Sequence, residues 1–338
     1  MEQKPKYTSS RFNDMLINQA TQAIEKASVK ELMEILQGFR KRASRDIYLR
    51  IRKEMIRRRA SLLPAINSED NDVVQKAETL ANFFFTFASN IPNVSGVYIQ
   101  YFKDDINELL SHYEEDLKEC VQYLDAEHLT RLSQALYLLK STEYETIFWR
   151  IEERVNELKD KLDAYHVTNI LRSFSKSQQN KTNGKDKTFY NLEPIVLKNL
   201  DKLNDRDATH LMYAYSVRNV GNPELHKAFE KKLTQIADRL DYPSMFNAIY
   251  YMLFTENMNE EIWKKIVDCT VQNPDILPLR YYKPFKASKI ILQAKLPKID
   301  LTDYIDKFWY AERYFSVIKF EDLLYSDKKY FNFKAFLN

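Results

Sequence analysis

The stretch that decides the fold is Leu203–Leu233, LNDRDATHLMYAYSVRNVGNPELHKAFEKKL. It contains two amphipathic helical patterns separated by Gly221-Asn222-Pro223, which ends one helix and starts the next. Asn204 stands where its side chain can accept a hydrogen bond from an orphan backbone N–H and cap the first helix. The stretch therefore predicts one helical hairpin.

The same helix start recurs along the chain. Leu124-Asp125, Leu162-Asp163, Leu203-Asn204 and Leu240-Asp241 are separated by 38, 41 and 37 residues. Inside each first helix a small residue precedes a large one, and an apolar residue lies three positions before the small one. These pairs are Gly38-Phe39, Thr86-Phe87, Ala135-Leu136, Ser173-Phe174, Ala214-Tyr215 and Ala248-Ile249. We expect the small residue to let the second helix approach and the large one to fill the core between repeats.

These patterns predict an all-α protein, an α-solenoid of about six stacked helical hairpins with an aromatic-rich C-terminal cap. We expect an N-terminal extension over residues 1–27, the helical repeat array over 28–276 and a cap or docking segment over 277–338. The residues expected to dock a protein are Trp309, Tyr310, Phe331, Phe333 and Phe336.

Composition narrows the classes of function. Only 4 glycines occur in 338 residues, which argues against a Rossmann unit or a P-loop, because both need positive φ angles. Cys120 and Cys269 have neither the number nor the spacing of a disulfide framework or a metal site. No apolar run is long enough for a membrane span, and the N-terminus has no secretory apolar core or clear transit peptide.

The basic charge is concentrated between Arg40 and Arg59. This stretch holds ten basic and two acidic residues, while the whole chain has a net charge of +3. The side chains at 45, 52 and 59 share a seven-residue spacing, so we expect an exposed positive helix face opposite a packed apolar one. Such a face suits RNA phosphate; an acidic protein, anionic lipid headgroups or solvent are the alternatives. The predicted anion-binding residues are Arg40, Lys41, Arg42, Arg45, Arg52, Lys53, Arg57, Arg58 and Arg59.

Asp-Ala-x-His occurs three times, at 125–128, 163–166 and 207–210. A row of metal ligands is one interpretation. We favour helix caps and first-turn residues, because the histidines fall in different predicted hairpins and are too far apart to share bonds of about 2 Å to one metal. No nucleophile–base signature is visible either. We therefore expect no enzyme, no cofactor and no metal.

The hairpin Leu203–Leu233 resembles the octotricopeptide or heptatricopeptide helical repeats, which also occur in the Fas-activated serine/threonine kinase-like organellar proteins. Leu124–Val155 and Leu80–Phe102 are similar to it, and the resemblance covers roughly residues 28–276. The C-terminus does not look like the RAP domain that often ends the RNA-processing members. Proteins of this kind are typically mitochondrial or plastid, and many bind RNA.

The resemblance implies a mitochondrial location and a place among the subunits of a larger assembly. The first hypothesis is a non-catalytic scaffold subunit of a mitochondrial ribonucleoprotein, such as the mitochondrial ribosome or an RNA-binding factor, with the basic helix on RNA phosphate. The alternative is a structural subunit of a mitochondrial respiratory or ATP synthase complex. In that case membrane contact would come only through the assembly or through anionic lipid headgroups.

Overall fold

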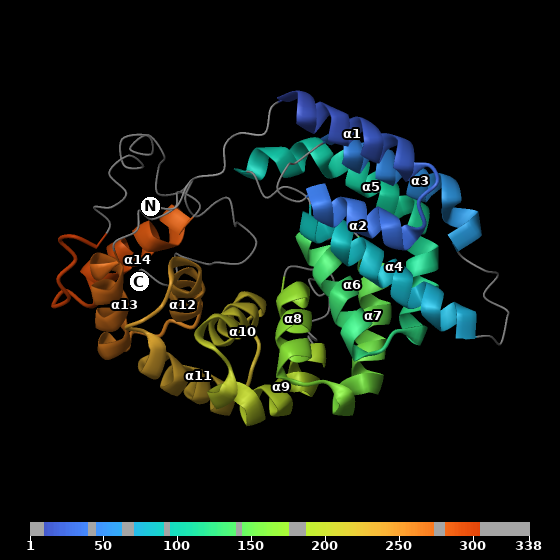
Figure 1. Cartoon of the computed structure of the whole chain (residues 1–338). Coiled ribbons are helices and arrows are strands. Elements are labelled where there is room, and N and C mark those ends of the chain that lie inside the picture. Colours follow the sequence, from blue (N-terminus) through green and yellow to red (C-terminus); the bar gives the residue numbers. More distant parts are fainter. Residues whose placement is uncertain are drawn as a thin grey trace. The chain divides into compact units, whose positions relative to one another are not determined.

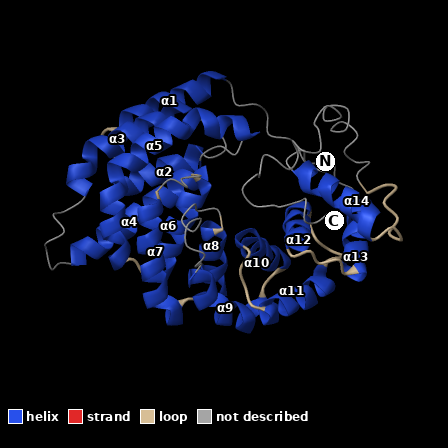
Figure 2. Ribbon diagram, turned by 180° about the vertical axis from the view of Figure 1, so that it is seen from behind, coloured by secondary structure: helices blue, strands red, loops and turns tan. Residues whose placement is uncertain are grey.

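The computed structural model describes residues 10–39, 45–62, 71–90, 95–139, 144–175, 187–273 and 281–304. Within these ranges the chain forms fourteen α-helices and three short 3-10 turns, with no strand (Figure 2). This confirms the predicted all-α class. Contacts divide the chain into two compact units, and among the described residues the first ends at Leu162 and the second begins at Asp163.

The described part of the first unit contains seven helices. They are α1 (Ser10–Ile24), α2 (Val29–Phe39), α3 (Arg45–Leu62), α4 (Asn71–Asn90), α5 (Ser95–Cys120), α6 (Ala126–Leu138) and α7 (Glu145–Leu158) (Figure 1). Helix α4 packs between α2 and α6, and α5 packs between α3 and α7. Helix α1, which lies in the expected N-terminal extension, contacts α3.

The second unit repeats this arrangement of helices. It contains α8 (Ala164–Phe174), α9 (Lys187–Asn199), α10 (Asp205–Arg218), α11 (Pro223–Ile236), α12 (Tyr242–Phe254), α13 (Glu260–Gln272) and α14 (Tyr282–Lys295) (Figure 1). Helix α10 packs between α8 and α12, which also contacts α14, and α11 packs between α9 and α13. In both units, therefore, helices that are two apart along the chain lie side by side.

The predicted helix caps are confirmed. Asp125, Asp163, Asn204 and Asp241 each accept a hydrogen bond from the backbone N–H three residues further on, at 2.8, 3.0, 2.8 and 2.9 Å. Each side chain satisfies a donor that the helix itself leaves unpaired. The recurring Leu-Asp and Leu-Asn pairs therefore fix where α6, α8, α10 and α12 begin.

The pairs of a small and a large residue are buried in five helices, from Thr86-Phe87 in α4 to Ala248-Ile249 in α12. The first pair differs. Gly38 is exposed, and a Cβ atom added to it would meet nothing within 4 Å. The expected close approach of a neighbouring helix is therefore wrong at Gly38, which lies in the last turn of α2.

A further recurring contact was not expected from the sequence. The carbonyl of the leucine before a cap accepts a hydrogen bond from a side chain 29 or 30 residues further along, on the second helix. Arg154 Nε binds Leu124 O at 3.0 Å, and Lys232 Nζ binds Leu203 O at 3.1 Å. In the hairpin of α12 and α13, Cys269 Sγ makes the corresponding contact and lies 3.5 Å from Leu240 O. These contacts tie the second helix of a hairpin to the start of the first.

No helix in the described part of the chain is both long enough and apolar enough to cross a membrane. The aromatic residues expected to dock a protein lie beyond Tyr304, outside the residues that the structure describes. They are Trp309, Tyr310, Phe331, Phe333 and Phe336.

Candidate functional site

The predicted anion-binding residues centre on α3. Arg40, Lys41 and Arg42 lie outside the described residues. Arg45 begins α3, but its side chain is not among those described. The remaining five, at positions 52, 53, 57, 58 and 59, lie on α3 with their side chains described.

Arg52 faces α5 and is not exposed as expected. It is 8% exposed, and its Nη1 atom contacts the carboxylate of Asp105 and lies 2.7 Å from Glu108 Oε2. Arg59 makes the corresponding ion pair with Asp116, further along α5. The prediction of an exposed face through positions 52 and 59 is therefore wrong for Arg52, and Arg59 has a partner within the chain.

The physical reason lies in the pattern of charge on α5. The seven-residue spacing does place Arg52 and Arg59 on one face of α3, but acidic side chains of α5 meet that face. Between the two ion pairs, the hydroxyl of Tyr113 donates to Met55 O at 2.6 Å, and burial raises the pKa of Tyr113. The acids at 105, 108 and 116 were the sequence signal that could have paired α3 with α5.

Arg58 is also held within the chain. Its guanidinium contacts the Glu54 carboxylate and donates to the carbonyl of Ile24 at 3.1 Å and to that of Ala27. These carbonyls lie at and just after the C-terminus of α1, where helical carbonyls lack intrahelical partners. Arg58 therefore joins α3 to the segment between α1 and α2.

The exposed positive charge of α3 lies on a different side of the helix from Arg52 and Arg59. Arg50, Lys53 and Arg57 are exposed, and their spacing of three and four residues places them on one side of the helix. Arg57 Nε also lies 2.9 Å from Glu54 Oε2, and this hydrogen bond is the largest cause of the lowered pKa of Glu54. We refer to Arg50, Lys53 and Arg57 as the α3 stripe. Among the described residues, it is the part of the predicted basic face where an external anion could bind.

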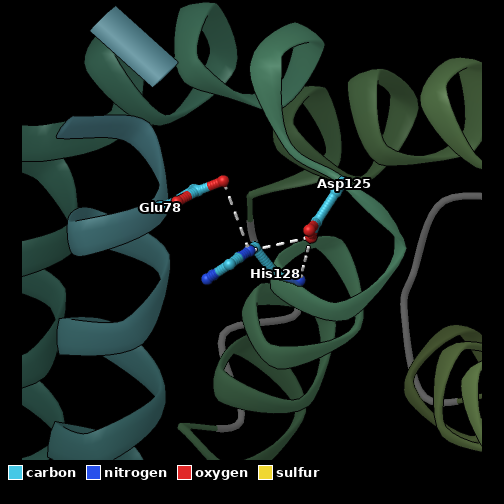
Figure 3. Close-up of side chains that lie close together, drawn as sticks. All are labelled: Glu78, Asp125 and His128. Carbon is cyan, nitrogen blue, oxygen red and sulfur yellow. Dashed lines mark hydrogen bonds and ion pairs between the residues drawn. The ribbon is translucent and has the colours of Figure 1, made fainter. Parts of the chain in front are cut away.

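A second cluster joins α4 to α6. Glu78 of α4, Asp125 at the N-cap of α6 and His128 in its first turn point toward one another (Figure 3). His128 Nδ1 lies 2.8 Å from Asp125 Oδ1 and 3.8 Å from Glu78 Oε1. One donor atom from each residue lies within 4.8 Å of the other two. Among the described residues this is the group with the composition and spacing of metal ligands.

The contacts between Asp125 and His128 are explained by the capping of helix α6. Burial acts to raise the pKa of Asp125, but hydrogen bonds from the backbone and ring of His128 outweigh it and lower the pKa. Asp163 and His166 form the same cap on α8, where the backbone N–H of Asp163 also donates to the ring. The Asp-Ala-x-His pattern therefore serves as a cap at both positions. Glu78 distinguishes the α6 copy, and sequence reasoning missed it because it comes from another helix.

The third copy of the pattern has a different place in its helix. Asn204 caps α10, and Asp207 lies in the first turn, where Asn204 Nδ2 donates to its Oδ2 at 2.8 Å. His128, His166 and His210 lie in α6, α8 and α10. The expectation that the three histidines belong to different helices is confirmed.

Two buried titratable groups have no site around them. Burial raises the pKa of the Cys120 thiol to about 12, so it is not a thiolate nucleophile near neutral pH. Glu193 of α9 is 3% exposed, and among the described residues no side chain pairs with its carboxylate. Its pKa is raised, first by burial. Neither group is paired with a base or an acid in a way that indicates catalysis.

No protein-family model and no curated protein matches this chain. The functional assignment therefore depends on the sequence pattern and on the contacts described above.

Proposed function

We propose that this chain is a non-catalytic α-solenoid that serves as a scaffold subunit of a larger assembly, and that the assembly is a mitochondrial ribonucleoprotein. The observation that carries the scaffold role is the recurring hairpin. The location and the RNA follow from the resemblance of the hairpins to octotricopeptide and heptatricopeptide repeats, which is carried by Leu203–Leu233.

Two structural features support a repeat array. Within each unit every first helix contacts the next first helix, and every second helix the next second helix. The contact between the leucine carbonyl and a side chain about 30 residues later recurs in three hairpins. In a repeat array each hairpin buries its apolar face mainly against its neighbours, so the array presents an extended surface rather than an enclosed pocket. Such a surface suits a protein or nucleic acid better than a small substrate.

We assign the RNA contact to the α3 stripe. Arg50, Lys53 and Arg57 are exposed, whereas Arg52 and Arg59 neutralise acids of α5. Arginine and lysine on an exposed helix can neutralise phosphates and release counterions, so binding should weaken as salt rises.

A structural subunit of a mitochondrial respiratory or ATP synthase complex is the second candidate. The observation in its favour is the internal pairing of Arg52, Arg58 and Arg59, which leaves less positive charge for RNA. In that assembly the α3 stripe would meet an acidic protein or anionic lipid headgroups.

The two candidates differ in what accompanies the protein from its native source. Tagged protein would be affinity-purified with and without nuclease, and the co-purifying proteins and RNA identified. The ribonucleoprotein proposal predicts ribosomal RNA and ribosomal proteins that are lost after nuclease treatment. Recovery of membrane-complex subunits that nuclease does not change would reject it in favour of the second candidate.

A further inference from the structure

We propose that Glu78, Asp125 and His128 bind a divalent transition-metal ion that links α4 to α6. This site goes beyond the proposed scaffold function and does not depend on the identity of the assembly. It also departs from the expectation of no metal, because the third ligand comes from a helix that the Asp-Ala-x-His pattern does not include.

The spacing of the donor atoms fits a metal with little rearrangement. Zinc binds imidazole nitrogen and carboxylate oxygen at about 2.0–2.2 Å in a tetrahedral arrangement, so neighbouring ligand atoms lie about 3.3–3.6 Å apart. His128 Nδ1 is 2.8 Å from Asp125 Oδ1 and 3.8 Å from Glu78 Oε1. These distances lie on either side of that range. The Glu78 and Asp125 oxygens lie within 4.8 Å of each other, so side-chain shifts of up to about 1 Å would bring all three atoms into one coordination sphere.

The charge of the cluster also favours a cation. The only ion-pair partner of Glu78 and of Asp125 among the described residues is His128. Arg131, one turn further along α6, is bound to Glu127 and to Asn82 instead. With a neutral imidazole the three side chains carry two negative charges, which a divalent ion would balance.

The two helices hold the ligands in place. Glu78 and Asn82 lie one turn apart on α4, and they face His128 and Arg131 on α6. Asp125 is fixed by its role as N-cap, because its Oδ1 atom accepts from the backbone N–H of His128 at 2.8 Å. A metal would therefore strengthen a packing contact that already exists, between α4 and α6.

A metal would compete with a proton for the Nδ1 atom of His128. Only an unprotonated imidazole nitrogen coordinates, so the metal takes the place of hydrogen at His128 Nδ1, and the Nε2 atom keeps the ring proton. The affinity should therefore fall as the pH is lowered. One imidazole and two carboxylates suit zinc or manganese, and water can complete the coordination of a partly exposed site.

The test measures zinc binding to the full-length protein at about pH 7.5 by equilibrium dialysis, with manganese as a second probe. Glu78→Gln removes one ligand charge. Asp125→Asn removes another but keeps the helix cap, since asparagine caps as well as aspartate. Asp163→Asn is the matched control, because it makes the same change at the equivalent Asp-Ala-x-His cap of α8. Circular dichroism checks that each variant is folded.

The proposal expects one zinc per chain, with an affinity lowered by about tenfold or more in Glu78→Gln and in Asp125→Asn, and unchanged in Asp163→Asn. Zinc should also raise the melting temperature of the wild type and of the control. A wild-type protein that binds no stoichiometric zinc would overturn the proposal. So would equal affinity in either ligand variant, or a comparable loss in the control.

Discussion

Charge reversal at Arg52 and at Lys53 should have opposite consequences, although the two residues are neighbours on α3. Arg52 is buried against Asp105 and Glu108, whereas Lys53 is exposed. Arg52→Glu would place a third carboxylate beside two others and leave all of them without a cation. Lys53→Glu changes the net charge by the same amount at the surface.

The expected magnitudes follow from burial. Breaking a buried ion pair costs about 3–5 kcal/mol, and the lower end applies because the Glu108 side chain is 51% exposed. For a unit of this size, a loss of about 3 kcal/mol lowers the melting temperature by about 6–12 °C. An ordinary surface substitution changes stability by about 0.5 kcal/mol or less, so Lys53→Glu should shift melting by no more than about 2 °C.

The assay is thermal unfolding of the full-length protein, followed by circular dichroism. Adding Asp105→Arg to Arg52→Glu restores an ion pair in reversed order, and it should recover part of the lost stability if the two side chains interact. Equal melting of the Arg52 and Lys53 variants would refute the assignment of Arg52 to the α5 contact. Failure of the reversed pair to recover any stability would refute the pairing with Asp105.

Three further substitutions test other parts of the structure. Glu193→Gln should raise the melting temperature at about pH 7.5 and have little effect near pH 4. The pKa of Glu193 is raised in the folded protein, so the wild type has its full stability below the unfolded pKa of about 4.3. It loses this stability as the pH rises through the folded pKa. An equal effect at both pH values would contradict a buried carboxyl that resists ionisation. In denaturant unfolding, Gly38→Ala should stabilise by about 0.5–1 kcal/mol because its Cβ has open space, whereas Ala214→Leu should destabilise by about 1–3 kcal/mol because Ala214 is fully buried. The same sign of change for both would show that the two small residues have the same environment. Asp241→Ala should cost about 1 kcal/mol in thermal unfolding, and Asp241→Asn much less, since only alanine removes the cap; equal losses would argue against the cap.

The sequence predicted those features that depend on residues close together in the chain. The caps at Asp125, Asp163, Asn204 and Asp241 and the burial of the pair Ala214-Tyr215 follow from local hydrogen bonding and helical periodicity. Periodicity gives the apolar face of a helix directly, and a polar residue before that face marks the helix start. These local rules were enough for the all-α class and the starts of α6, α8, α10 and α12.

Features that depend on pairing between distant helices were missed. The spacing of Arg52 and Arg59 showed that they share a face, but not that Asp105 and Asp116 of α5 would meet it. Glu78 reaches His128 only because α4 packs on α6. An exposed positive face and an internal ion-pair network have the same pattern within one helix, so only the partner helix distinguishes them.

The proposed RNA contact is tested most directly by the salt dependence of binding to a mixed-sequence single-stranded RNA. Wild-type protein would be compared with a variant in which Arg50 and Lys53 are changed to glutamate, while Arg57 is kept because it pairs with the buried Glu54. Both changed residues are exposed, so the variant should melt like the wild type. We expect wild-type affinity to fall with salt with a logarithmic slope of about −2 or steeper, because each neutralised phosphate contributes about −0.7. The variant should lose this binding. Equal binding by both proteins, or wild-type binding that does not respond to salt, would contradict the assignment of RNA to the α3 stripe.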